Sequence, residues 1–156
     1  MRILIAAVGR LRGGPEVELA SDYVQRAAVA GRNLGFKGVD IVEAEAKPNG
    51  DQRAEASALF RATPDDARKI LLDERGAEWT SRQLAEKLGR WRDDGLGHAL
   101  FWIGGADGVS QSVKDQADEK LAFGRQTWPH RLVRAMIAEQ IYRAVTILGA
   151  QPYHRD

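Results

Sequence analysis

The sequence contains no cysteine and no hydrophobic run long enough to span a membrane. Without cysteine, the chain of 156 residues has no disulfides, thiolate nucleophiles, iron–sulfur clusters or cysteine-ligated zinc sites. A membrane-spanning helix needs about 20 consecutive apolar residues. The start, Met1 to Ile5, also lacks the following small-residue cleavage site of a secretory signal. These absences predict a protein of a reducing compartment, with the cytoplasm as the expected location.

Three motifs that are common in α/β enzymes are also missing. The first predicted strand is followed by residues 9–14, GRLRGG, which is not the G-x-G-x-x-G turn of dinucleotide-binding proteins. Neither a G-x-x-x-x-G-K-[ST] P-loop nor a G-x-S-x-G nucleophile elbow occurs. The three histidines, His98, His130 and His154, do not have the spacing of metal ligands, so no metal site is predicted.

The net charge is small, +1, but it is unevenly distributed. Residues 125–156 carry five arginines against two carboxylates, and two of the three histidines. The preceding 124 residues are slightly acidic. A basic end on a nearly neutral body can contact a polyanion locally, but it lacks the broad positive footprint of a bulk nucleic-acid binder.

Strand-like and helix-like patterns alternate along the whole chain. Short apolar runs predict strands at residues 2–9, 38–45, 68–73, 98–103 and 121–123. Helical spacing predicts helices at residues 16–31, 51–62, 81–92, 110–119 and 129–148. This alternation predicts an α/β fold, with a mostly parallel sheet flanked by helices, in a single domain over residues 1–156.

Local signals mark several boundaries of these elements. Thr80 and Gln83 have the spacing of a capping box, and Ser110 is expected to cap the short helix that follows it. Residues 47–50, Lys-Pro-Asn-Gly, predict a loop, and Pro129 is expected in the first turn of the longest helix. One apolar stripe is predicted on that helix, formed by Leu132, Val133, Met136, Ile137, Ile141, Ala144, Val145 and Leu148.

Residues that follow the predicted strands are candidates for a ligand site, because ligands of open α/β sheets bind beyond the carboxyl ends of the strands. Leu72 and Asp73 end the third strand, and residues 104–108, GGADG, follow the fourth, where glycine lets backbone atoms approach a ligand. Residues 123–128, FGRQTW, extend from the end of the fifth predicted strand to Pro129 and could form a wall around a flat ring. Each segment also has a purely structural alternative. Asp73 could simply cap its loop, residues 104–108 could form a tight turn between a strand and a helix, and residues 123–128 could form a packed loop.

The end of the longest helix and the tail carry a second group of candidates. Arg143, Tyr153, His154 and Arg155 are expected near one another. Arginine suits phosphate, and tyrosine or histidine can stack on an unpaired base. The alternative for the tail is a frayed, solvated terminus. Glu139 and Arg143, four residues apart on a helix, also predict a simple surface ion pair.

Five motifs together resemble one protein family. They are residues 71–73 (LLD), 103–108 (IGGADG), 127–134 (TWPHRLVR), 138–144 (AEQIYRA) and 152–155 (PYHR). The resemblance is to the ribosomal RNA large subunit methyltransferase H family (RlmH), a small branch of the SPOUT methyltransferases. It runs from the first predicted strand to the last residue, and the motifs of the second half are its specific part.

This resemblance implies a fold and a function that the patterns alone do not give. The implied fold is a SPOUT fold with a C-terminal deep trefoil knot. The implied function is methylation of the N3 position of a pseudouridine in large-subunit (23S) ribosomal RNA, within the ribosome, by a cytoplasmic homodimer. The implied cofactor is S-adenosyl-L-methionine, with contacts at Leu72, Gly104, Phe123, Gly124, Arg125, Gln126, Thr127 and Trp128.

His154, Arg143 and Tyr153 are the candidate catalytic residues. We expect His154 and Tyr153 to contact the target nucleotide, with the partner subunit as a potential source of these side chains. A cation is expected to stabilise the anion that a pseudouridine imide forms when it loses its proton.

Three other functions remain open from the sequence. One is a SPOUT-type RNA methyltransferase that acts on transfer RNA or on another ribosomal base. Another is a ribosome-binding protein that keeps the fold without catalysis. The third is a flavodoxin-type domain that binds FMN.

Overall fold

The described part of the chain forms a five-stranded parallel sheet. The computed structural model describes residues 1–10, 12–46 and 51–155. The strands lie in the order β2-β1-β4-β3-β5, and each pairing between these strands is parallel. They are β1 (Arg2–Val8), β2 (Gly38–Ala44), β3 (Ala67–Glu78), β4 (His98–Ile103) and β5 (Glu119–Ala122). The predicted α/β class is confirmed.

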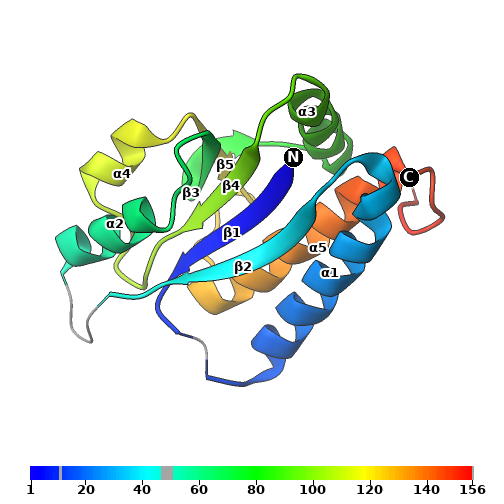
Figure 1. Ribbon diagram of the computed structural model, residues 1–156. Helices are drawn as coiled ribbons and strands as arrows, with labels where there is room; N and C mark the ends of the chain where they lie inside the picture. The colour runs from blue at the N-terminus through cyan, green and yellow to red at the C-terminus, as the bar shows by residue number, and fades with distance from the viewer. Residues whose placement is uncertain (11, 47–50, 156) are drawn as a thin grey trace.

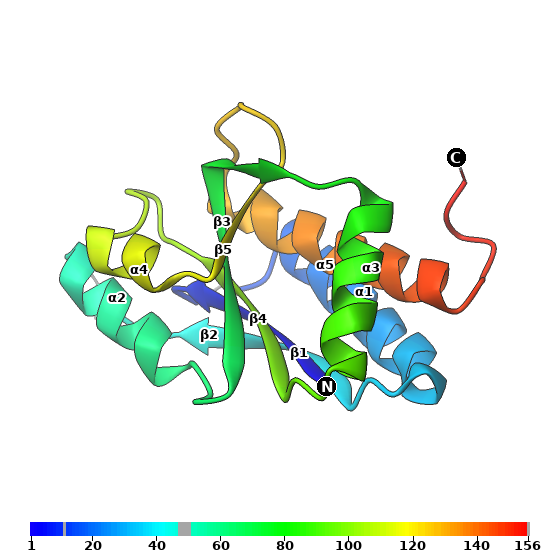
Figure 2. The same ribbon diagram turned by 90° about the horizontal axis from the view of Figure 1, so that it is seen from above.

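Helices cover both faces of the sheet, as Figures 1 and 2 show. The helices are α1 (Pro15–Gly31), the 3₁₀ turn η1 (Arg32–Leu34), α2 (Gln52–Arg61), α3 (Ser81–Asp93), α4 (Gln111–Gln116) and α5 (His130–Leu148). Helices α1, α3 and α5 cover one face, and α2 and α4 cover the other. None of the described helices is long and apolar enough to cross a membrane.

Each face of the sheet has its own apolar cluster. Ile5 and Phe101 belong to the cluster beneath α1, α3 and α5, whereas Leu4 and Trp102 belong to the one beneath α2 and α4. Successive residues of a strand point to opposite faces, so a strand that is covered on both sides is apolar throughout. This is why β1 and β4 appear in the sequence as continuous apolar runs.

The predicted helix signals have different outcomes. Thr80 and Gln83 form the predicted capping box: the Gln83 amide donates to Thr80 Oγ1 over 3.1 Å, and the Thr80 amide donates to Gln83 Oε1 over 2.8 Å. Ser110 does precede α4, but its side chain makes no capping hydrogen bond and lies 2.8 Å from the hydroxyl of Ser112. The loop predicted at residues 47–50 lies outside the described residues.

Strand β3 is longer than predicted, because it continues past Asp73 to Glu78. Residues 74–78 are polar or small, so no hydrophobic alternation marks them as a strand. After an irregularity between Leu72 and Ala77, backbone pairing with β5 resumes at Ala77 and Glu78. A Cβ on Gly76 would lie 2.7 Å from backbone atoms of Lys120 and Leu121, so the extension lies directly against β5.

The predicted apolar stripe of α5 is divided between two environments. Its members Ile137, Ile141, Ala144 and Val145 are buried in the core, whereas Leu132 and Met136 line a surface groove between α1 and α5. The predicted stripe therefore faces both the core and this groove. The reason is the broad contact of α5 with its neighbours, since it packs on α1, α3 and the sheet at once.

The buried face of α5 also contains a charged residue, Arg134, which is only 2% exposed. Its Nη2 donates to the carbonyl oxygens of Val8 and Gly9, over 2.5 Å and 3.0 Å. These carbonyls lie at and just beyond the carboxyl end of β1. Arg134 therefore fixes the start of α5 to the edge of the sheet where ligands bind in α/β proteins.

Candidate active site

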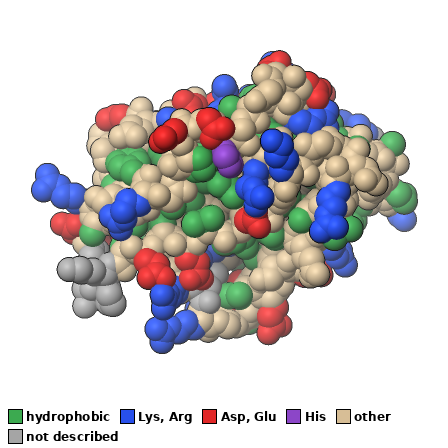
Figure 3. Space-filling model, in the orientation of Figure 1, with side chains coloured by type: hydrophobic (Ala, Val, Ile, Leu, Met, Phe, Trp, Pro, Cys, Tyr) green, Lys and Arg blue, Asp and Glu red, His purple; other side chains and the backbone are tan. Residues whose placement is uncertain are grey.

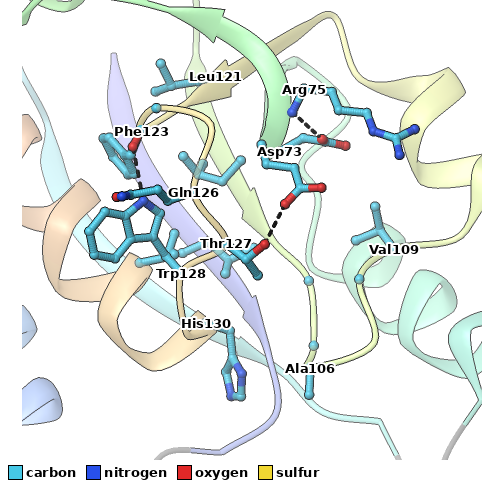
Figure 4. Close-up of a pocket in the computed structure, with 18 of the residues that line it drawn as sticks. Asp73, Arg75, Ala106, Val109, Leu121, Phe123, Gln126, Thr127, Trp128 and His130 are labelled. Atoms are coloured by element: carbon cyan, nitrogen blue, oxygen red, sulfur yellow. Dashed lines mark hydrogen bonds between the residues drawn. The ribbon is translucent and has the colours of Figure 1, made fainter.

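A pocket of about 300 Å³ lies at the carboxyl ends of β3, β4 and β5. Three segments enclose it: the extended end of β3, the glycine-rich turn after β4, and the loop of residues 123–128 after β5. Figure 4 shows the loop on one side and the turn after β4 on the other. We call this cavity the strand-end pocket. It lies where the rule for open α/β sheets places ligands.

Seven of the eight residues predicted to contact a cofactor line this pocket. They are Leu72, Gly104, Phe123, Gly124, Gln126, Thr127 and Trp128. The eighth, Arg125, is exposed in the same loop and is not among the lining residues. The fold therefore gathers residues from three distant segments around one cavity, and their contact with a cofactor remains a prediction.

Hydrogen bonds hold the loop after β5 in place. Thr127 Oγ1 donates to the Glu74 carboxylate over 2.9 Å, which ties the loop to the extension of β3. Trp128 Nε1 donates to the carbonyl of Phe123 over 3.1 Å and so closes the loop on itself (Figure 4). Trp128 remains 38% exposed. One aromatic wall of the pocket thus has a fixed position.

Helix α2 supports the glycine turn on the opposite wall from outside the pocket. A Cβ on Gly105 would lie 2.7 Å from Glu55 Oε1. The Glu55 carboxylate can therefore approach this turn only because residue 105 is glycine. Gln52 Nε2 donates to the carbonyl of Asp107 over 2.8 Å. Burial raises the pKa of Glu55, and the nearby Asp107 carboxylate raises it further.

Several pocket residues were not predicted from the sequence. Glu74 and Arg75 were missed because the predicted strand ended at Asp73. Val109 and Lys114 follow the glycine turn, and His130 begins α5. The Pro-His motif at residues 129–130 was the one available signal for His130, and it gave no role for that side chain.

The three predicted catalytic residues form a separate cluster at the end of α5. The Arg143 guanidinium lies 4.8 Å from the centre of the Tyr153 ring, and its Nη1 is 3.4 Å from His154 Nδ1. The Tyr153 hydroxyl donates to Glu139 Oε1 over 3.1 Å, and its ring packs on Tyr142 at 4.6 Å. We call Arg143, Tyr153 and His154, with their neighbours Glu139 and Tyr142, the tail cluster. Its contacts show that residues 153 and 154 are folded back onto α5.

Glu139 organises the charges of the tail cluster. Arg143 Nε donates to Glu139 Oε1 over 2.9 Å, which confirms the predicted i,i+4 ion pair. This hydrogen bond raises the pKa of Arg143. Burial raises the pKa of Tyr153, as do its contacts with Tyr23 and Glu139, so its phenol stays protonated at physiological pH.

The tail cluster and the strand-end pocket lie toward opposite ends of α5. His130 lines the pocket at the first residue of the helix, and Arg143 is thirteen residues further on. At a rise of 1.5 Å per residue, the two are about 20 Å apart along the axis. Figure 2 shows the loop before α5 and the C-terminal tail at different ends of the helix. Within one chain, the predicted catalytic residues therefore do not line the pocket.

Comparisons with known proteins assign the chain to a family. Residues 1–154 match the family model described as "Predicted SPOUT methyltransferase". Ribosomal RNA large subunit methyltransferase H of Phenylobacterium zucineum is 56% identical over the whole of both chains, and that of Hyphomonas neptunium is 53% identical over 99% of each. The chain belongs to the SPOUT methyltransferase family. Within it, the chain groups with the methyltransferase H proteins, as the motifs predicted.

One solved structure that resembles the chain is more distant in sequence. A chain described as a probable methylase family protein from Haemophilus influenzae is 13% identical, with a TM-score of 0.49, over 99% of this chain and 70% of that one. The assignment to the SPOUT methyltransferases rests on the family model and on the full-length relatives.

As a SPOUT methyltransferase, the protein uses a methyl donor. The trefoil knot that the resemblance implies remains a prediction. The close contact of Gly76 with the backbone of β5 is the point at which the extended β3 lies against the segment that leads into α5.

Proposed function

We propose that this protein transfers a methyl group from S-adenosyl-L-methionine to N3 of a pseudouridine in large-subunit ribosomal RNA, as a cytoplasmic homodimer. The observation that carries the proposal is the strand-end pocket, in which seven of the eight cofactor positions implied by the resemblance surround one cavity. The full-length relatives named as ribosomal RNA large subunit methyltransferases support the RNA substrate.

The residues of the pocket fit this donor chemically. A Cβ on Gly104 would lie 2.5 Å from a methyl carbon of Val109, so the turn after β4 leaves room only for backbone at this point. Leu72 and Phe123 add apolar surface for a flat ring, and the Glu74 carboxylate suits a cationic ligand. When bound, the donor supplies an electrophilic methyl group. The protein's contribution is to hold it in line with the attacking nitrogen.

A groove between α1 and α5 supports the homodimer. It has a volume of about 410 Å³ and a mostly apolar lining that includes Leu19, Leu132 and Met136. Leu19 is 48% exposed and lies beside Leu132 and Met136, so apolar side chains are gathered in one surface patch, which is typical of an interaction site. A second copy of the chain, packed through the same groove, would bury these side chains.

The position of this groove gives a reason for the tail to act in the partner subunit. Phe123 lines both the groove and the strand-end pocket, and Tyr23 and Glu139 of the groove contact Tyr153 of the tail. The groove thus runs from the pocket to the chain's own tail. A two-fold axis across it would place the tail cluster of each subunit near the pocket of the other.

The charge distribution supports local rather than broad contact with RNA. Figure 3 shows Lys and Arg interspersed with Asp and Glu on the face that it presents. The basic groups of the tail cluster, Arg143 and His154, would then contact the target nucleotide at the composite site. Arg143 would stabilise the negative charge that develops on the imide during transfer.

A thermal-unfolding scan with candidate ligands tests the cofactor assignment. S-adenosyl-L-methionine at 100 times its dissociation constant should stabilise the native state by about 2.7 kcal/mol, and FMN should have no effect. Gly104→Val should remove the ligand-dependent shift, because the larger side chain would collide with Val109. Gln25→Val, on an exposed position of α1, is the matched control and should keep the shift.

Methyl incorporation then separates the remaining functions. Transfer to pseudouridine N3 in large-subunit RNA is the expected result. Transfer to transfer RNA or to another base would instead indicate a different SPOUT specificity. Ribosome binding without incorporation, at saturating donor, would indicate a non-catalytic binding protein.

A further inference from the structure

Methylation of a pseudouridine imide requires a destination for its proton, because a protonated imide nitrogen is a poor nucleophile. Lysine and arginine side chains already carry their protons at neutral pH and do not accept another. Among the described residues, the ionisable side chains that line the strand-end pocket are Asp73, Glu74, Arg75, Lys114 and His130. Two carboxylates and one imidazole therefore remain as acceptors.

Both carboxylates are engaged in holding the walls of the pocket. Asp73 Oδ1 accepts a hydrogen bond from the backbone amide of Arg75 over 2.8 Å (Figure 4). The Glu74 carboxylate accepts the hydroxyl proton of Thr127. No hydrogen bond joins the ring of His130 to any other part of the chain that the structure describes, so its ring nitrogens are available to a ligand.

The backbone that carries His130 is held firmly. His130 is the first residue of α5, directly after Pro129, whose ring restricts the entry of the chain into the helix. The first turns of α5 are fixed by Arg134, through the carbonyls of Val8 and Gly9, and by Arg131, whose Nη2 donates to the carbonyl of Gly13 over 3.0 Å. In Figure 4, His130 extends from the α5 wall at the end of the pocket where Ala106 lies on the other wall.

The surroundings keep this imidazole unprotonated near neutral pH. Burial lowers the pKa of His130, and the cations Arg134 and Arg131 lower it further. The same cations favour an anion formed nearby. The other charged groups around the pocket are Asp73, Glu74 and Arg75 on β3 and Lys114 on α4, and Glu43 on β2 acts on Arg134.

We propose that His130 is the general base of the methyl transfer and accepts the N3 proton of the target pseudouridine. This inference rests on the proposed function. The N3–H bond breaks and its proton moves to a ring nitrogen of His130. The N3–CH₃ bond forms as the methyl–sulfur bond breaks, and the electron pair of that bond returns to sulfur. The imidazolium, next to two arginines, then releases its proton to water.

The test measures initial rates of methyl transfer to ribosomal RNA that carries unmodified pseudouridine, between about pH 5 and 9. For the wild type, kcat should rise through one ionisation below the ordinary histidine pKa of about 6.5 and then reach a plateau. His130→Gln should lower kcat by about 10²–10⁴-fold and remove that ionisation. Donor affinity, measured by calorimetry, should change less than about twofold, and free imidazole should restore part of the activity of His130→Ala.

Two further measurements make the result specific. An NMR titration of the wild type without ligand should show a His130 pKa below its ordinary value, assigned by comparison with His130→Gln. His98→Gln is the matched control. His98 is the first residue of β4, lies away from the pocket and pairs with Asp66, so its replacement should leave the rate profile unchanged. Asp73→Asn should keep the ionisation seen in the wild type.

The outcomes distinguish this inference from the proposed function. Normal kcat in His130→Gln, or an ionisation that disappears only in Asp73→Asn, would overturn the assignment of the base. Loss of donor binding in His130→Gln would make His130 a binding residue instead. If the wild type itself transferred no methyl group to the RNA, the proposed function would fail, and this inference would fail with it.

Discussion

Beside the strand-end pocket, two side chains lie close to backbone because the residues they approach are glycines. Gly104 and Gly105 lie in the same turn. The Val109 side chain occupies the space beside Gly104, and the Glu55 carboxylate occupies the space beside Gly105. Glu55 Oε2 is buried without a hydrogen-bond partner among the described residues. A carboxylate in that position is less stable when ionised than it would be in water.

We therefore predict that Glu55→Gln changes stability in a pH-dependent manner. Because the pKa of Glu55 is raised in the folded state, the stability that its carboxyl contributes is present at low pH and is lost as pH rises through the folded-state pKa. The variant should equal or exceed the wild type in Tm at pH 7.5 and lose that advantage at pH 4. The effect should stay below about 1 kcal/mol, because the side chain is partly solvated. A variant that is clearly less stable than wild type at pH 7.5 would contradict this expectation.

At the scale of the elements, the pocket depends on how β3 and β5 meet. The extension of β3 carries Glu74, which holds the loop after β5 through Thr127. The same extension lies against β5 at Gly76. The strand therefore positions one wall of the pocket by backbone contact and by one side chain at the same time.

Gly76→Ala is predicted to separate these two strands. Its Cβ would lie 2.7 Å from backbone atoms of Lys120 and Leu121, which have no flexible side-chain end to move aside. We expect a loss of about 2–3 kcal/mol in the free energy of unfolding, measured in urea, together with weaker donor binding. Gly149→Ala is the control, because its Cβ would meet only ordinary contacts at 3.4 Å. If the two variants unfolded alike, β3 would not be held against β5 as described.

At the scale of the whole molecule, the pocket and the tail cluster belong to opposite ends of α5. A single chain places Arg143 about 20 Å along the helix from His130, so one subunit does not assemble the proposed site. The apolar groove between α1 and α5 connects the two regions. The proposed dimer would bring them together by symmetry.

Deletion of residues 153–156 should then abolish methylation, by about 100-fold or more, and leave donor binding intact. Mixing that variant with Gly104→Val should restore activity, because one chain supplies the pocket and the other the tail. After subunit exchange, half of the dimers are mixed and each has one competent site, which gives about a quarter of wild-type activity. Unchanged turnover in the truncated protein would exclude a role for the tail, and no recovery on mixing would place pocket and tail in one subunit.

The sequence by itself determined the order and type of the elements, because buried parallel strands are apolar throughout and helix starts carry local capping residues such as Thr80. It also gave the family, through the motifs around Gly104, Pro129 and Tyr153. Local signals did not reveal the extension of β3, which is polar and held by backbone pairing, or Arg134, whose partners Val8 and Gly9 lie more than 120 positions away. Only the tertiary structure decided that Glu55 reaches the glycine turn and that His130 reaches the pocket. It also decided that the tail lies far from the pocket of its own chain. These are contacts between segments distant along the chain, and they depend on the packing of α2 and α5 against the sheet.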